Sequence, residues 1–211
     1  WYGILLAMVF IVGYYIMKNI YKRENLSEDQ LDNLLVYMMV STIIGARLGH
    51  CLFYEPSYYL SNPIEIIKIW EGGLASHGGA IGILIGLYFY SKKIKKPYLW
   101  ILDRIVVPVA IGGAFIRMGN LMNSEIYGDP TTLPWGFKFV REYPIGMPLE
   151  NIPACHPTQI YEAIFCLLVF VYLLHVYYKK NMAEKHPGFM FGIFLIVVFG
   201  SRILIEFIKN P

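Results

Sequence analysis

The stretch QIYEAIFCLLVFVYLLHVYY, residues 159–178, decides the kind of fold that this chain can adopt. Its residues are almost all apolar, and Glu162 carries the one formal negative charge. A run of about 20 mostly apolar residues is long enough to cross the ~30 Å hydrocarbon core of a bilayer as a helix. We therefore expect this stretch to lie in lipid rather than in a water-soluble core.

The composition of the whole chain agrees with that expectation. Of its 211 residues, 56% are hydrophobic and 16% are charged, and the mean hydropathy is +0.49. An average soluble domain carries about 25% charged residues, so a soluble fold of this size could not cover so much apolar surface. The net charge of +3 is too small to argue for a nucleic-acid partner.

Six apolar runs of this kind predict an all-α polytopic membrane protein, because a helix that crosses the membrane satisfies its own main-chain hydrogen bonds. We interpret residues 1–211 as a single membrane-embedded domain. The chain starts at Trp1 rather than Met and stops at Pro211 after a helical run, a pattern typical of a sequence trimmed at both ends. The predicted spans are residues 1–17, 34–54, 74–90, 99–118, 159–178 and 188–208.

The loops between the predicted spans differ in charge and so indicate an orientation. One set carries ten basic residues, and the opposite set, residues 55–73 and 119–158, carries three. Basic loops remain in the cytoplasm, so we expect the first span to enter from outside. The external loop at 119–158 is too long for a simple connection, and loops of this length tend to be functional or disordered. Its six prolines and its aromatic residues favour an ordered cap on the outer membrane surface.

Polar residues gather at the predicted external ends of the spans, whereas the cytoplasmic ends carry mainly lysines and the pair Asp103 and Arg104. Charged residues within the hydrophobic depth cost at least about 2.5–3.5 kcal/mol each on insertion scales and usually face a bundle interior or a cavity. We therefore predict a polar chamber in the outer half of the bundle. Its candidate residues are Tyr2, Arg47, His50, His77, Arg117, Asn120, Asn123, Glu125, Gly128, His156, Gln159, Tyr161, Glu162, Arg202 and Glu206.

Several of these residues also allow a purely structural interpretation. Arg47 could extend to the outer headgroups or pair with Glu55. Arg202 and Glu206 are one turn apart and could neutralise each other. Arg117 has no partner in its own span, so we expect its charge to be free for an anion.

The residue types at this end favour chemistry on a phospholipid headgroup. Arginine suits phosphate because its planar fork donates two parallel hydrogen bonds. His77, followed by Gly78 and Gly79 at a helix start, could accept a proton near neutral pH. A transporter or lipid flippase would also need a polar chamber, but such proteins often show inverted repeats and sites at the midplane, and neither is visible in this sequence. A receptor-like protein that binds an anionic lipid without chemistry is the third possibility.

The segment RMGNLMNSEIYG, residues 117–128, resembles the signature of the bacterial phosphatidylglycerol–prolipoprotein diacylglyceryl transferase family, G-R-x-G-N-F-x-N-x-E-x-x-G. The resemblance runs nearly end to end. It also covers WYG at 1–3, GARLG at 45–49, HGG at 77–79, HPTQIYE at 156–162, and Arg202 with Glu206. Ile116 and Leu121 depart from the signature, and Val198 stands where many members have Tyr. The family has a seventh span after this point.

The resemblance implies that a diacylglyceryl group moves from phosphatidylglycerol to the lipobox cysteine of a preprolipoprotein, with release of glycerol 1-phosphate. It implies a location in the bacterial cytoplasmic (inner) membrane, with the active site facing the periplasmic leaflet. It implies no metal or organic cofactor, and the sequence shows no metal-ligand cluster.

Roles for individual residues follow as hypotheses. We expect His77 to be the base, although assistance by the substrate or its phosphate stays open, and we expect Arg117 and Arg202 to bind the phosphate. The residues expected to bind or orient substrate are Tyr2, Arg47, Asn120, Asn123, Glu125, Gly128 and Glu206, with the two glutamates positioning the arginines.

Overall fold

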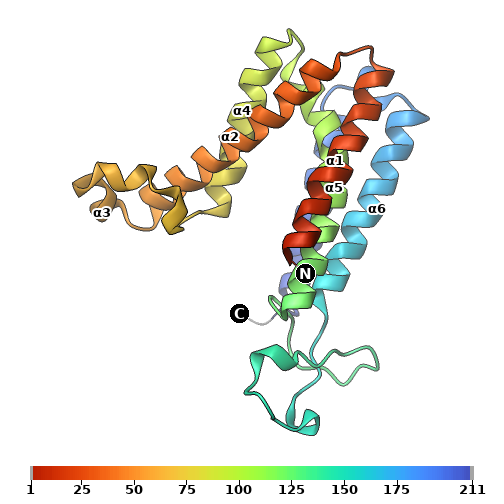
Figure 1. Cartoon of the computed structure of the whole chain (residues 1–211). Coiled ribbons are helices and arrows are strands. Elements are labelled where there is room, and N and C mark those ends of the chain that lie inside the picture. The colour runs from red at the N-terminus through yellow and green to blue at the C-terminus, as the bar shows by residue number, and fades with distance from the viewer. Residues whose placement is uncertain (1, 210–211) are drawn as a thin grey trace. The chain divides into compact units, whose positions relative to one another are not determined.

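The computed structural model describes residues 2–209, with the backbone alone at Tyr2 and Leu6. Trp1, the first residue of the expected first span, and the Tyr2 side chain, expected to bind substrate, lie outside the described residues. The chain is helical, and within the described part its β-type pairs are isolated bridges rather than strands (Figure 1). The helices are α1 (Tyr2–Arg23), α2 (Glu28–Phe53), α3 (Pro56–Ser61), α4 (Ser76–Lys93), α5 (Tyr98–Asn123), α6 (Thr158–Tyr178), α7 (Met182–Lys185) and α8 (Phe189–Glu206), with short 3₁₀ turns η1 (Pro63–Ile67), η2 (Ile69–Glu71), η3 (Val140–Glu142) and η4 (Leu149–Asn151). The all-α prediction is confirmed.

Five of these helices are long and apolar enough to cross a membrane: α1, α2, α5, α6 and α8. The protein is therefore a multi-pass membrane protein by length and composition. The helix expected as the third span, α4, is not among the five. It is 18 residues long, but it contains four glycines and has polar residues at both ends, which lower its hydropathy.

The chain forms two compact units, one containing Tyr21–Ile101 and the other containing the residues before Tyr21 and after Ile101. In the Tyr21–Ile101 unit, α2 and α4 form an antiparallel pair whose closest contacts involve glycines. A Cβ added at Gly49 would lie 2.7 Å from Gly78 Cα, and one added at Gly82 would lie 2.9 Å from Gly45 Cα. Small residues let helix backbones approach closely in lipid, so these glycines account for the close crossing of α2 and α4.

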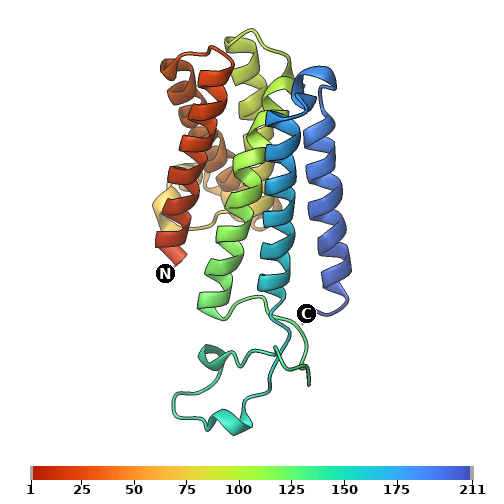
Figure 2. The ribbon, with the colours of Figure 1, turned by 90° about the vertical axis from the view of Figure 1, so that its right-hand side faces the viewer.

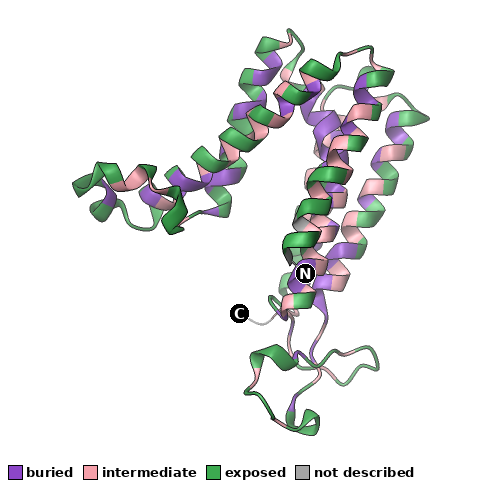
Figure 3. Ribbon diagram, in the orientation of Figure 1, coloured by how far each residue is buried: buried purple, intermediate pink, exposed green. Residues whose placement is uncertain are grey.

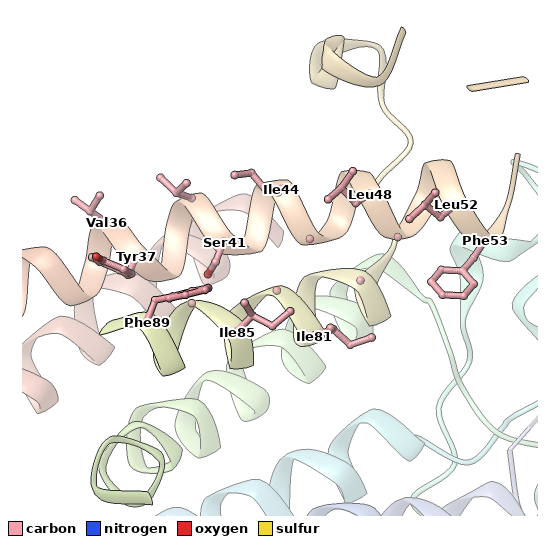
Figure 4. Close-up of a pocket in the computed structure, with 16 residues that line it drawn as sticks. Val36, Tyr37, Ser41, Ile44, Leu48, Leu52, Phe53, Ile81, Ile85 and Phe89 are labelled. Carbon is pink, nitrogen blue, oxygen red and sulfur yellow. The ribbon is translucent and has the colours of Figure 1, made fainter. Parts of the chain in front are cut away.

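An apolar groove of about 620 Å³ follows this helix pair. Figure 4 shows side chains from both helices along it, with Val36 and Phe89 near one end and Phe53 near the other. Its lining is almost entirely hydrocarbon. Large exposed apolar surfaces mark contacts with a membrane, a ligand or another protein, which agrees with the placement of α2 in a membrane.

In the other unit, α5 is the central helix. Of its membrane-spanning stretch, 61% of the residues are buried, against 33% for α6 and 17% for α8. Buried positions are purple in Figure 3. Figure 2 shows α5, α6 and α8 side by side. A Cβ added at Gly112 would lie 2.9 Å from Val9 Cγ1 of α1, and one at Gly113 would lie 3.0 Å from Cys166 Sγ of α6. Small residues on α5 thus bring two neighbouring helices close.

Asp103, near the start of α5, caps the N-terminus of α8. Its carboxylate accepts hydrogen bonds from the main-chain N–H groups of Gly188 (2.6 Å) and Phe191 (2.9 Å), and the side chain is fully buried. The first N–H groups of a helix have no partner within the helix and favour negative charge. The predicted cytoplasmic charge at Asp103 therefore has a structural role: it fixes where α8 begins.

The loop between α5 and α6 is held by hydrogen bonds between its outgoing and returning halves. Phe137 and Cys155 exchange two main-chain bonds of 2.9 Å, and the His156 N–H donates to the Asp129 carbonyl at 3.0 Å. The Gly128 N–H donates to the His156 carbonyl at 2.9 Å. Cysteine 155 and glycine 128 lie at the base of the loop, so these bonds fix the chain where it leaves α5 and returns to α6.

Candidate functional site

Arg117 lies six residues before Asn123, the last residue of α5, and forms an ion pair with Glu162 of α6 through Nε. The side chains are 17% and 6% exposed. Within the described residues, neither Nη group of Arg117 has a hydrogen-bond partner. A guanidinium has five N–H donors in a planar fork, so pairing at Nε orients the group and leaves the end of the fork available.

Lys209 extends this charge network from the chain segment after α8. Its Nζ lies 3.9 Å from Glu162 Oε1 and 3.7 Å from Glu206 Oε2, and its side chain is 11% exposed. Two expectations are thereby wrong: Arg117 does not keep an unpaired charge, and Glu206 pairs with Lys209 and not with Arg202. The partner of Arg117 comes from α6, so inspection of its own span could not reveal it. We use the name Arg117 cluster for six residues: Arg117, Asn120, Glu125, Gln159, Glu162 and Lys209.

Glu125 organises the polar side chains next to this ion pair. Its carboxylate accepts hydrogen bonds from Asn120 Nδ2 (3.0 Å) and Asn123 Nδ2 (3.1 Å), and its carbonyl accepts one from Gln159 Nε2 (2.6 Å). The expectation that Glu125 positions an arginine is therefore corrected: within the described residues it positions two asparagines. It does so because its place just after α5 lies beside the last turn of the helix that carries Asn120.

The backbone on both sides of Glu125 is strained. Ser124 and Ile126 adopt left-handed conformations, with φ of 61° and 59°. A β-branched residue such as Ile126 rarely adopts this conformation, and strain of this kind collects at functional sites where surrounding contacts enforce it. One enforcing contact is the hydrogen bond from Thr158 Oγ1 to the Ile126 carbonyl at 2.8 Å.

Two buried acceptors of the cluster lack partners. Asn120 is 6% exposed and Gln159 is 1% exposed, and neither Asn120 Oδ1 nor Gln159 Oε1 accepts a hydrogen bond from the described residues. An unsatisfied buried polar group costs about 1–3 kcal/mol. A donor that reached these oxygens would recover that free energy, so the cluster is suited to a ligand with hydroxyl or N–H groups.

Gly128, expected among the substrate-binding residues, is buried where the loop closes. A Cβ added there would lie 2.8 Å from both His156 Cβ and Thr158 Cγ2. Its backbone also forms a bridge to Lys209. The structure thus accounts for a glycine at this position by close packing.

Arg202 lies on an exposed part of α8. With Phe199, Ile203, Glu206 and Phe207 it lines a cavity of about 550 Å³, and among the described residues it has no hydrogen bond or ion pair. The proposed alternative of an Arg202–Glu206 ion pair is therefore not observed. The guanidinium remains able to bind an anion.

In the Tyr21–Ile101 unit, His77 is the second residue of α4 and is exposed. It lines a cavity of about 470 Å³ together with His50, Tyr54 and the chain at 73–76. The ring of His50 stacks on Tyr54 with centroids 5.6 Å apart. Within the described residues His77 has no hydrogen-bond partner, so both of its ring nitrogens are available to exchange a proton.

Arg47 is 4% exposed and its partners are main-chain carbonyls. Nε donates to Ile66 O (2.9 Å), Nη1 to Gly72 O (2.5 Å) and Gly73 O (3.3 Å), and Nη2 to Glu65 O (2.6 Å). The two interpretations offered for Arg47, extension to the headgroups and pairing with Glu55, are both wrong. The chain that connects α2 to α4 folds onto the guanidinium instead.

The whole chain, residues 1–211, matches the family described as prolipoprotein diacylglyceryl transferase. The chain belongs to this family. It is 51% identical over 213 residues to the phosphatidylglycerol–prolipoprotein diacylglyceryl transferase of Porphyromonas gingivalis, covering 99% of this chain and 75% of that protein. Proteins of the same name are similar to it in Tolumonas auensis (46% identical; 100% of this chain and 78% of that protein) and Chloroherpeton thalassium (47%; 100% and 75%).

Some residues were expected in the polar chamber but were given no role of their own. Glu162 and Gln159 belong to the HPTQIYE segment, and both enter the Arg117 cluster. Tyr161 of the same segment accepts a hydrogen bond from Trp135 Nε1 at 2.9 Å and so ties the loop to the start of α6. The segment was the available signal for Glu162, whereas Lys209 had none except its position three residues after Glu206. Within residues 2–209, no three His, Cys, Asp or Glu side chains group as a metal site would require.

Proposed function

We propose that this chain transfers the diacylglyceryl group of phosphatidylglycerol to the lipobox cysteine thiol of a preprolipoprotein, the first step of lipoprotein maturation in bacteria. The observation that carries the proposal is the fork of Arg117, which its pairing with Glu162 through Nε leaves open. Such a fork binds phosphate with two parallel hydrogen bonds. The names of the relatives supply the substrates that fit it.

In the reaction, the cysteine loses its proton and the thiolate attacks the glyceryl carbon that bears the phosphate oxygen. A carbon–sulfur bond forms, the carbon–oxygen bond breaks, and its electron pair leaves on glycerol 1-phosphate. The thiolate is the nucleophile and must be generated from a thiol of pKa about 8.5. His77 is the proposed base, since it is exposed and hydrogen-bonded to none of the described residues. Assistance from the substrate phosphate is the alternative route for that proton.

Charge develops on the phosphate oxygen as the carbon–oxygen bond breaks. Preorganised donors aimed at such charge are the largest single contribution in many enzymes. Arg117 and Arg202 are the proposed donors, with Glu162 holding the first of them in place.

The headgroup glycerol carries hydroxyl groups, and the free amide oxygens of Asn120 and Gln159 are acceptors that suit them. Asn123, Glu125 and Tyr2 complete the proposed substrate-binding set. Glu206 orients Lys209, and Gly128 maintains the packing at the base of the loop. Arg47 is not included, because main-chain carbonyls occupy its donors.

We further propose that α4 is a sixth span, that a seventh follows in the family's full pattern, and that residues 1–211 form one membrane-embedded transferase domain. The excess of basic residues in one set of loops supports an orientation with residues 119–158 as a periplasmic cap. The protein would then lie in the cytoplasmic (inner) membrane, with its site toward the periplasmic leaflet. Both substrates reach it there, the lipid within the membrane and the preprolipoprotein by its apolar signal peptide.

The direct test uses the full chain in detergent with phosphatidylglycerol and a peptide that contains a lipobox cysteine. Mass spectrometry should show the diacylglyceryl adduct on the peptide and glycerol 1-phosphate in solution, and a peptide with serine in place of cysteine should give neither. If folded protein binds the lipid and yields no adduct, the transferase proposal is wrong, and a lipid transporter or lipid-binding protein takes its place.

A further inference from the structure

We propose that Arg47 is a positioning residue: it binds the main chain between α2 and α4 and thereby fixes the approach to His77. This inference rests on the proposed function, in which His77 acts as the base. It assigns to a membrane-embedded arginine a role other than binding the phosphate of the lipid.

The guanidinium has little donor capacity left for a ligand. Four of its five N–H groups are accounted for by the carbonyls of Glu65, Ile66, Gly72 and Gly73, at 2.5–3.3 Å. The ring of Tyr59 covers it, with the guanidinium carbon 5.1 Å from the ring centroid. A phosphate could bind here only after several of these bonds were broken.

These hydrogen bonds satisfy both the buried charge of Arg47 and the main-chain carbonyls of the chain that connects α2 to α4. Arg47 lies six residues before the end of α2, about 9 Å along the helix axis. A charge at such a depth is costly unless it faces polar groups. The connecting chain around Glu65 and Gly72 lies outside the long helices, and its carbonyls need donors. Folding the connection back onto Arg47 satisfies both requirements.

The bound segment leads directly to His77. At Gly73 the chain passes so close to the helix that an added Cβ would lie 2.6 Å from His50 Cδ2 and 2.8 Å from Arg47 Nη1. Two residues later, the Ala75 N–H donates to the carbonyl of Ala46 at 2.9 Å. His77 follows within the first turn of α4 and lines the same cavity as His50 and Gly73. Release of Arg47 therefore loosens one wall of that cavity.

The test compares Arg47→Lys and Arg47→Ala with wild type, and Arg141→Ala, an exposed loop arginine, serves as the control. The first measurement is hydrogen exchange of peptides that cover residues 62–75, which requires no turnover. We expect faster exchange in both Arg47 variants and none of this change in Arg141→Ala. Lysine should restore little, because an ammonium on a flexible stem cannot reproduce the planar fork.

The second measurement is steady-state transfer with phosphatidylglycerol as the varied substrate. A misplacement of about 1 Å can cost about 10²-fold in rate, so we expect kcat to fall by about that factor with KM for the lipid unchanged. A phosphate ligand would behave differently: KM would rise, Arg47→Lys would retain much of the activity, and exchange of residues 62–75 would not change. That set of results would overturn the proposal.

A second variant tests the same contact from the other side. Gly73→Ala places a methyl group against His50 and Arg47 at a residue with φ of +70°, so we expect it to reproduce the exchange and kcat changes of Arg47→Lys. Gly192→Ala is the matched control, since nothing lies within 4 Å of its added Cβ. If Gly73→Ala exchanges and turns over like wild type, the positioning role is wrong even where Arg47→Ala fails to fold. A wild-type protein without transferase activity refutes the proposed function, whereas the exchange data still decide the role of Arg47.

Discussion

Arg47 and Arg117 occupy equivalent places in their helices and have opposite surroundings. Arg47 lies six residues before Phe53, the end of α2, and Arg117 lies six residues before Asn123, the end of α5. Arg47 donates to four main-chain carbonyls, whereas Arg117 pairs through Nε with one carboxylate, that of Glu162. The first arrangement keeps the positive charge but uses the donors. The second balances the charge but keeps the end of the fork open, so the partner and not the residue type determines whether a buried arginine can bind a ligand.

The largest effect is expected at Glu162, because this one carboxylate pairs with Arg117, whereas main-chain carbonyls accept the hydrogen bonds of Arg47. Glu162→Ala leaves Arg117 and Lys209 without their shared carboxylate in a buried environment. Removal of one partner of a buried pair costs about 3–5 kcal/mol, and we expect the free energy of unfolding to fall by that amount. Reversible unfolding in mixed micelles measures it. Glu150→Ala, in the exposed loop, is the control, and equal stability of the two variants would show that the ion pair contributes nothing.

Removal of the open fork itself should have the next largest effect. Arg117→Ala deletes the proposed phosphate donors, and loss of one preorganised donor costs about 10²–10³ in kcat, or about 2.7–4 kcal/mol. Arg117→Lys should be intermediate, because it retains charge without the fork. The assay is transfer to the lipobox peptide, with Arg141→Ala as the control. Normal binding of phosphatidylglycerol and normal turnover by Arg117→Ala would remove Arg117 from the mechanism.

A smaller effect is expected where the helix that carries Arg47 crosses α4. Gly49→Ala places a methyl group 2.7 Å from Gly78 Cα, so the two helices must separate. Overpacking of this kind costs about 1–3 kcal/mol. Gly200→Ala meets nothing within 4 Å and should stabilise α8 by about 0.5–1 kcal/mol, because glycine is unfavourable inside a helix. Unfolding in mixed micelles compares the two, and a neutral Gly49→Ala would mean that the crossing is looser than described.

The sequence was sufficient for much of this architecture, because apolar length determines where a chain can cross lipid. The run at 159–178 and the helix Thr158–Tyr178 nearly coincide. The expected span at 34–54 begins six residues late, since α2 starts at Glu28 behind the cap of Ser27. The first turns of α2 are polar and are stabilised by the cap of Ser27 and Gln30. A search for apolar runs therefore does not detect them.

The partners of the two arginines could not be predicted in the same way. Glu162 is visible in the sequence, but its pairing with Arg117 depends on how α6 is rotated against α5. The partners of Arg47 are main-chain carbonyls. Every residue has a carbonyl, so these partners cannot be recognised from residue types in the sequence. Side-chain motifs therefore indicated which polar residues to consider, and the structure was needed to show which of them bind one another.

The smallest predicted effect concerns the loop beside the Arg117 cluster. The side chain of Arg47 holds the segment between α2 and α4, whereas main-chain hydrogen bonds hold the base of this loop. Cys155 exchanges two such bonds with Phe137 and is 3% exposed. Burial, and to a lesser degree the negative charge of Asp129, raises the pKa of the Cys155 thiol above its ordinary value. Because the thiolate is the reactive form, maleimide labelling at pH 8 should be slower than that of a free thiol and should accelerate as the pH rises.

Replacing Cys51 and Cys166 with alanine confines the label to Cys155, and Asp129→Asn isolates the minor electrostatic contribution. We expect this substitution to speed labelling slightly, because it removes a charge that opposes the thiolate. If Cys155 in the folded protein reacts as fast as in detergent-unfolded protein, the loop does not hold this pairing. The loop between α5 and α6 would then not be fixed in the way that Arg47 fixes the connection between α2 and α4. The fork of Arg117 would have to be positioned by α5 and α6 alone.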